Sequence, residues 1–179
     1  KYENIVIMDG DLQNDPGVYP IHAMSNLLTG LVQVGGIDTT GSLRKIIINR
    51  ENKVHAIIDM YDYLLKGALP NNIQLRDQDT VFVPIRLSTI RIDSLVMRPG
   101  IYESKPGETI FDIITYSGGL VPNASSSIGI SRVIPISKRE VTKPNMEKFY
   151  VKLSESKEVI AQNGDLISIN KIFETISHV

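Results

Sequence analysis

The sequence of 179 residues contains no cysteine, so it offers neither a disulfide nor a thiolate metal site. It contains no tryptophan, and aromatic residues make up only 6% of it, which leaves few side chains on which a sugar ring could stack. No apolar run approaches the roughly 18 residues of a membrane-spanning helix. These absences exclude a disulfide scaffold and a helical membrane span within this sequence.

Charge and hydrophobic content are those of a folded domain. The 19 basic and 20 acidic residues give a net charge of −1, so there is no long-range attraction to nucleic acid or to an anionic membrane. We expect no nucleic acid partner. A hydrophobic fraction of 42% suffices for a real core. Because the first residue is Lys1 and no signal peptide follows it, we expect a fragment or a processed form.

One stretch of the sequence occurs twice. DPGVYPIHAMSNLLTGLVQVGG begins at Asp15, and RPGIYESKPGETIFDIITYSGG begins at Arg98. In both copies Pro-Gly is followed two residues later by tyrosine, and Gly-Gly closes the stretch at the same spacing. The offset between the copies is 83 residues throughout, as from position 17 to position 100. Such a shared spacing predicts two copies of one structural unit.

Each copy predicts the same order of elements. A β-rich run, residues 4–9 or 89–96, leads into Pro-Gly, which is typical of a tight turn, and a second strand carries the tyrosine. A helix of about ten residues follows, and in the second copy Thr109 and Asp112 form the pattern of a capping box. The Gly-Gly pairs are expected to end the helices, because glycine adopts positive φ without strain.

The rest of each copy predicts further strands. RKIII (44–48) and RVIPI (132–136) occupy the same place in the repeat, and polar turns containing Asp79 and Asp165 precede the last strands. In the second copy VPNASSSIG (121–129) is expected to be a longer loop. The boundary falls between positions 84 and 88, which gives units 1–86 and 87–179. We predict an α+β fold of two tandem β-grasp (ubiquitin-like) units, each with one helix on a mixed sheet of four or five strands.

The ordered motifs resemble those of the SLBB domain, the soluble ligand binding β-grasp module. In the first copy the resemblance is carried by Pro16, Gly17, Tyr19, Gly35, Gly36, Asp59, Leu75, Asp79 and Pro84. In the second copy it is carried by Pro99, Gly100, Tyr102, Gly118, Gly119, Gly164 and Asp165. The second copy departs from the family pattern at Ile169–Asn170, where the family often has Val-Pro.

Tandem modules of this kind resemble those of Wza-type polysaccharide export proteins. The resemblance implies a non-catalytic pair of modules on the periplasmic face of the bacterial outer membrane. It also implies oligomers of the longer protein that enclose a channel for capsule or exopolysaccharide. The implied partners are other copies of the protein, the polysaccharide in passage and an inner-membrane export partner. The alternative is a soluble module that binds a small molecule or a glycan, because a fold does not settle a role.

The sequence presents no candidate catalytic or metal-ligating residues and implies no cofactor. DGDLQND (9–15) begins like a calcium loop but lacks its glycine and glutamate, so we interpret it as an acidic hairpin loop. The spacing of His22, His55 and His178 matches no metal site. The pairs Asp59/Asp62 and Asp77/Asp79 are interpreted as turn-capping carboxylates rather than as acid–base partners. We therefore expect no enzyme activity.

Four residues are candidates for ligand contact. Tyr19 and Tyr102 occupy matched positions in the two copies. They are interpreted either as hairpin packing residues or as stacking partners of a sugar ring. Asn123 and Ser125 lie in the polar stretch that only the second copy has. That stretch is interpreted either as a flexible connector or as a loop for ligand or subunit contacts.

Overall fold

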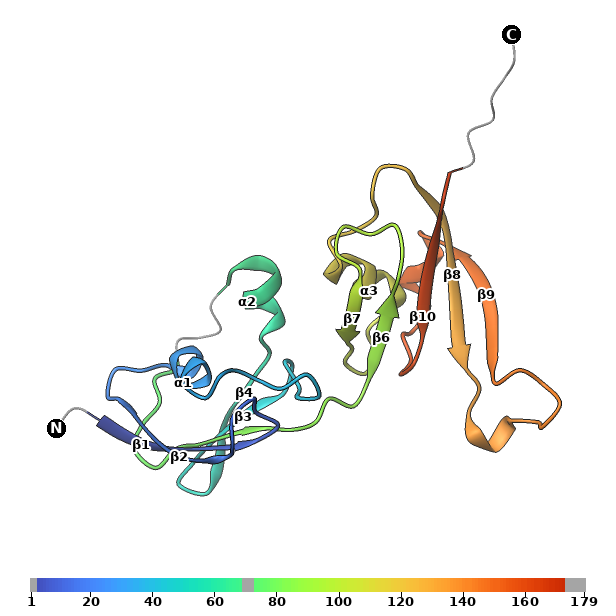
Figure 1. Ribbon diagram of the computed structural model, residues 1–179. Coiled ribbons are helices and arrows are strands. Elements are labelled where there is room, and N and C mark those ends of the chain that lie inside the picture. The colour runs from blue at the N-terminus through green and yellow to red at the C-terminus, as the bar shows by residue number, and fades with distance from the viewer. Residues whose placement is uncertain (1–2, 69–72, 173–179) are drawn as a thin grey trace, which may run out of the picture. The chain divides into compact units, whose positions relative to one another are not determined.

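A computed structural model describes residues 3–68 and 73–172 (Figure 1). The chain divides into two compact units, Lys1–Leu87 and Ser88–Val179. Within its described residues, each unit contains one five-stranded mixed sheet with a helix packed on one face. The predicted α+β fold of two tandem β-grasp-like units is thereby confirmed.

The first unit has its strands in the order β2-β1-β5-β3-β4. Strand β1 pairs antiparallel with β2 and parallel with β5, which lies at the centre of the sheet. Between β1 and β5 the chain forms β2, the helix α1, the hairpin of β3 and β4, and the short helix α2. The elements are β1 (Glu3–Gly10), β2 (Gly17–His22), α1 (Leu27–Gln33), β3 (Ile46–Arg50), β4 (Lys53–Ile58), α2 (Tyr61–Lys66) and β5 (Thr80–Val83).

The second unit repeats this topology with the strand order β7-β6-β10-β8-β9. Its central strand β10 pairs parallel with β6 and antiparallel with β8, as β5 does with β1 and β3. Two 3-10 turns, Ile136–Lys138 and Glu155–Lys157, follow β8 and β9. The elements are β6 (Thr89–Ile92), β7 (Gly100–Glu103), α3 (Ile110–Tyr116), β8 (Ala124–Val133), β9 (Met146–Lys152) and β10 (Leu166–Lys171).

Alternation along the strands separates a core face from an open face of each sheet. In β1, Val6 and Met8 are buried under α1, whereas Ile5 and Ile7 point to the opposite face and are about 40% exposed. The second core is equally apolar and is built largely of isoleucine, including Ile90 and six others: Ile92, Ile110, Ile113, Ile128, Ile130 and Ile167. Each unit therefore has a core of its own.

Both main helices begin at a capping box and end at the Gly-Gly pair. Thr109 and Asp112 exchange the two predicted hydrogen bonds at the start of α3. Asn26 and Thr29 form the same two bonds at the start of α1. This pair differs from the usual capping box, which has serine or threonine followed three residues later by glutamate or glutamine. At the end of α1 the N–H of Gly36 donates to the carbonyl oxygen of Leu31 at 2.8 Å. At the end of α3 the N–H of Gly119 donates to that of Ile114 at 2.9 Å. The Gly-Gly pairs end the helices as predicted, and both glycines of each pair have positive φ.

Two details of the predicted strands are wrong. The stretch expected to be a loop, VPNASSSIG, is mostly the first part of β8, which begins at Ala124. Pairing with β10 and β9 imposes the extended form on a serine-rich sequence of weak strand propensity. The second error is the alignment of RKIII with RVIPI, which matched Arg44 with Arg132. In the two sheets Arg132 occupies the position of Arg50.

Candidate functional site

The matched tyrosines close the Pro-Gly hairpins. The hydroxyl of Tyr19 donates to the carbonyl oxygen of Asp15 at 2.6 Å, and that of Tyr102 donates to Arg98 at the same distance. Both rings are half-buried against the core of their unit. Burial raises the pKa of Tyr102. The structure thus places both tyrosines in hairpin packing, and each hydroxyl is engaged by the backbone.

Asn123 and Ser125 lie at the start of β8, away from Tyr102. The carbonyl of Asn123 accepts from the backbone N–H of Ile172 at 3.1 Å, and Ser125 Oγ accepts from the N–H of Ser127. Tyr102 belongs to the edge strand β7, which two strands separate from β8. The predicted ligand contacts of the second unit are therefore not brought together into one site.

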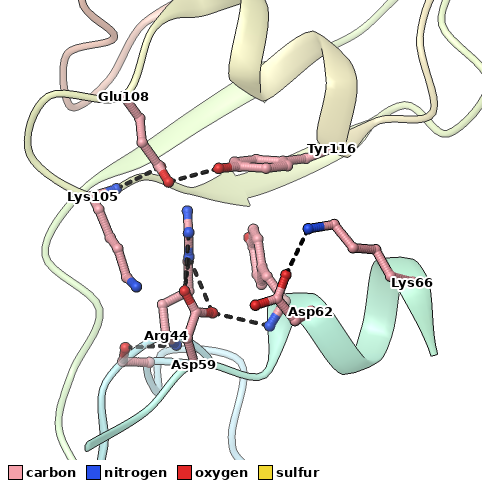
Figure 2. Close-up of polar contacts among 9 residues, drawn as sticks. Arg44, Asp59, Asp62, Lys66, Lys105, Glu108 and Tyr116 are labelled. Carbon is pink, nitrogen blue, oxygen red and sulfur yellow. Dashed lines mark hydrogen bonds and ion pairs between the residues drawn. The ribbon is translucent and has the colours of Figure 1, made fainter. Parts of the chain in front are cut away.

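The paired aspartates do not converge as acid and base. Asp59 accepts from Nε and Nη2 of Arg44 at 3.1–3.3 Å and from the N–H of Tyr61 at 3.0 Å (Figure 2). The guanidinium also lies over the Tyr61 ring, 4.3 Å from its centroid. Asp62 instead pairs with Lys66 along α2 at 2.8 Å. Each carboxylate therefore has its own structural partner at the start of α2.

A glutamate makes a comparable local contact in the second unit. Glu108 accepts the Tyr116 hydroxyl at 2.6 Å and the backbone N–H of Lys105 at 2.8 Å (Figure 2). The bond from Lys105 closes the turn before α3, and the bond from Tyr116 joins that turn to the last residue of the helix. Glu108 thereby fixes the approach of the chain to α3.

Histidines and carboxylates form no metal cluster among the described residues. His22 Nδ1 lies 3.2 Å from the backbone nitrogen of Met24, and His55 Nε2 lies 3.1 Å from Nη1 of Arg50. The two histidines are thus engaged locally, on different strands. His178 lies outside the described residues.

An Arg–Asp pair recurs at the same point of both sheets, and the sequence analysis missed it. Arg50 binds Asp79 through Nε and Nη2 at 2.8 and 2.7 Å, and Arg132 binds Asp165 in the same way at 2.9 and 2.8 Å. Both aspartate side chains are fully buried. The aspartates had been aligned, but as turn caps alone.

Each of these aspartates also holds the polar turn before the last strand. In the first unit Asp79 Oδ2 accepts from the N–H of Arg76 at 2.8 Å, and in the second unit Asp165 Oδ2 accepts from Gln162 at 2.9 Å. Burial acts to raise the pKa of Asp79, yet the bonds from Arg50 and Arg76 outweigh it and leave that pKa below its ordinary value. Asp79 is therefore ionised at neutral pH, and its pair with Arg50 serves the fold.

Six apolar side chains lie on the open face of the first sheet, where Thr80 pairs with Ile7 and Asp9 pairs with Phe82. Ile7 faces Val18 across β1 and β2, and Ile47 of β3 lies between Phe82 of β5 and Ile57 of β4. Val18 is 63% exposed and Ile57 is 58% exposed. We call these five residues, together with Ile5, the apolar face. It crosses all five strands on the side opposite α1.

The same positions on the second sheet carry different chemistry. Arg91 stands where the first sheet has Ile7, and Ser168 stands where it has Phe82. Tyr150 faces Gly129 as Ile57 faces Ile47. We call Arg91, Ser127, Ser131, Lys148, Tyr150, Lys152 and Ser168 the polar face; the apolar residues Ile101, Val133, Met146 and Leu166 lie on the same side. The period-two pattern of MEKFYVK, which separates Phe149 and Val151 from the intervening residues, was the sequence signal for it.

Comparison with known proteins identifies the family. Models of the SLBB domain match residues 5–83 and residues 94–145. The chain therefore belongs to the SLBB family and carries two SLBB domains in tandem, as its motifs predicted.

Two curated relatives come from Escherichia coli, and each is named polysialic acid transport protein KpsD. Each is 28% identical to this chain over 167 residues, which cover 92% of this chain and 28% of the relative. The chain thus spans less than a third of the length of the curated relatives it matches. In the described part of the chain, no helix is both long enough and apolar enough to cross a membrane.

Proposed function

We propose that this chain is a non-catalytic pair of SLBB modules from a polysaccharide export protein, and that it packs copies of that protein into an oligomeric channel. Its tandem SLBB domains and its likeness to a polysialic acid transport protein support the export role. The proposed location is the periplasmic face of the outer membrane, with an inner-membrane export component as a further partner.

The observation that carries the packing role is the apolar face of the first sheet. A soluble monomer rarely leaves a continuous apolar surface open, because covering it releases about 25 cal/mol for each Å² removed from water. Here Ile7 and Val18 are 40% and 63% exposed on the adjoining strands β1 and β2, and Ile57 is 58% exposed on β4, the opposite edge strand of the sheet. We assign a second copy of the protein as the occupant, since the near-zero net charge opposes no self-association.

A scaffold role also agrees with how the polar residues are used. The buried ion pairs and the aspartates of α2 serve the fold, as described above. Each of the two units has a hydrophobic core of its own. Such units can hold subunits together without any chemistry of their own.

Replacing Ile57 by lysine in the full-length protein is expected to reduce self-association at least tenfold, because the variant places a charge in an interface that excludes water. Sedimentation velocity measures the effect as a shift from oligomer to smaller species. The isolated 179-residue chain is expected to be monomeric or weakly associated.

The matched control is Val32→Lys, since Val32 is 69% exposed on α1, on the other side of the sheet. This variant should assemble as the unmodified protein does. Equal assembly of the Ile57→Lys and unmodified proteins would refute the role of the apolar face. A full-length protein that stays monomeric at high concentration would refute the proposed function.

A further inference from the structure

We propose that the polar face of the second sheet is a binding surface for an acidic polysaccharide, with Tyr150 as its stacking ring and Lys148 and Lys152 as its charge contacts. The inference rests on the proposed function and names the chemistry of the polymer and the surface that meets it. It differs from the predicted ligand contacts, because Tyr19 and Tyr102 pack in hairpins instead.

Tyr150 packs against the backbone of the neighbouring strand. It faces Gly129 on the neighbouring strand, and a methyl group at Gly129 would come within 3.1 Å of Cε1 of the ring. The ring therefore covers bare backbone on one side. Its side chain is nevertheless 57% exposed, so the rest of the ring meets solvent. An aromatic ring that is packed on one side and exposed on the other can stack against the apolar face of a sugar.

The two lysines place positive charge on both sides of that ring. Lys148 and Lys152 flank Tyr150 at two residues on either side of β9, which puts all three on one face. Lys148 Nζ lies 5.3 Å from the Tyr150 ring centroid. Neither ammonium group has an ion-pair partner in the described part of the chain. Arg91, by contrast, is held by Asp93 at 2.5 Å, so it adds no net charge.

Serine side chains lie next to β9 on the polar face. Ser131 is the cross-strand partner of Lys148, and Ser127 is the partner of Lys152. Ser168 lies beside Gly129 on β10. Hydroxyl groups that both donate and accept hydrogen bonds match the hydroxyl groups of a sugar chain. The face thus combines an aromatic ring, hydroxyls and two ammonium groups that have no ion-pair partner among the described residues.

The fold does not require these residues, because the first unit builds the same sheet without them. At the position of Tyr150 it has Ile57, at that of Gly129 it has Ile47, and at that of Ser168 it has Phe82. Two units of one topology therefore present an apolar face and a polar, cationic face. Strand β9 also contains Glu147, but that residue pairs with Arg132 on the other side of the strand, so the two lysines leave the polar face with positive charge.

Titration of polysialic acid oligomers against the 179-residue chain tests this proposal. Calorimetry should give about tenfold weaker binding for Tyr150→Ala. The double variant Lys148→Gln/Lys152→Gln should bind more weakly and lose most of its dependence on salt concentration. The matched control is Lys45→Gln/Lys53→Gln, which removes two exposed charges from the first unit. Uncharged dextran of similar length serves as the control polymer.

The outcomes separate the proposals. Loss of binding in the β9 variants, with normal binding in the control and weak binding of dextran, supports the polar face as the site. Equal binding by all variants, equal binding of dextran, or no binding of the acidic polymer at millimolar concentration overturns it. The same variants in the full-length protein should still assemble, so failure here leaves the packing role intact. Thermal melts establish that each variant is folded.

Discussion

The Asp165→Ala variant is expected to destabilise the second unit by about 3–5 kcal/mol, because it leaves the largely buried Arg132 guanidinium without the carboxylate that it binds. Arg132 is only 15% exposed, and two of its hydrogen bonds end on Asp165. The same substitution removes the acceptor for the N–H of Gln162, so the turn before β10 also loses its support. Both losses act on the central strand of the sheet.

Urea unfolding, followed by NMR signals from each unit, measures this effect. The transition of the second unit should move to lower urea, while that of the first unit stays in place because the sites are far apart in the chain and have separate cores. Asp93→Ala is the control, since Asp93 pairs with Arg91 while both are largely exposed; it should cost no more than about 1 kcal/mol. Similar costs for the two variants would contradict a structural role for the buried pair.

Gly10→Ala is expected to cost on the order of 3 kcal/mol in the first unit, through backbone strain and overlap together. Gly10 has a backbone φ of +91°, which residues that carry a side chain rarely adopt. A methyl group there would lie 2.1 Å from the carbonyl oxygen of Val83, a backbone atom that cannot rotate away. Because Gly10 pairs with Val83 across β1 and β5, relief of the overlap would separate two strands of the sheet.

Gly36→Ala separates the two causes. Gly36 has a similar φ of +98°, but a methyl group there would meet no atom within 4 Å. Its cost should therefore be the strain alone, about 1 kcal/mol. Thermal or urea unfolding of both variants gives the comparison. A Gly36→Ala cost equal to that of Gly10→Ala would show that close approach to β5 contributes nothing.

Local signals in the sequence predicted most of the fold. Pro-Gly, the Thr109/Asp112 capping box and the Gly-Gly pairs each act within a few residues, so their geometry follows from nearby sequence. Their recurrence at one spacing then predicted the duplication. The serine-rich start of β8 could not be predicted in this way, because its extended form comes from strands paired on both sides.

The candidate sites were harder to predict, since they depend on which strands are neighbours. Arg50 and Asp79 are 29 residues apart, and Arg132 and Asp165 are 33 apart, so no fixed spacing links them. The apolar and polar faces likewise arise only when five strands are placed in order. Tyr19 and Tyr102 were recognised because they repeat, but their hydroxyls donate to backbone carbonyls of the Pro-Gly hairpins. The informative aromatic residue, Tyr150, has isoleucine as its counterpart in the first unit.

The central claim is that the two open faces have different partners, and thiol labelling tests it most directly. Because the chain has no cysteine, Ile57→Cys and Tyr150→Cys place one reactive group at equivalent positions of the two sheets. In the assembled full-length protein, with labelling quantified at each site by mass spectrometry, position 57 should be protected from maleimide and position 150 should react freely. In the 179-residue chain both should react. Free reaction at position 57 in the assembly, or protection at position 150 without polymer, would contradict the account.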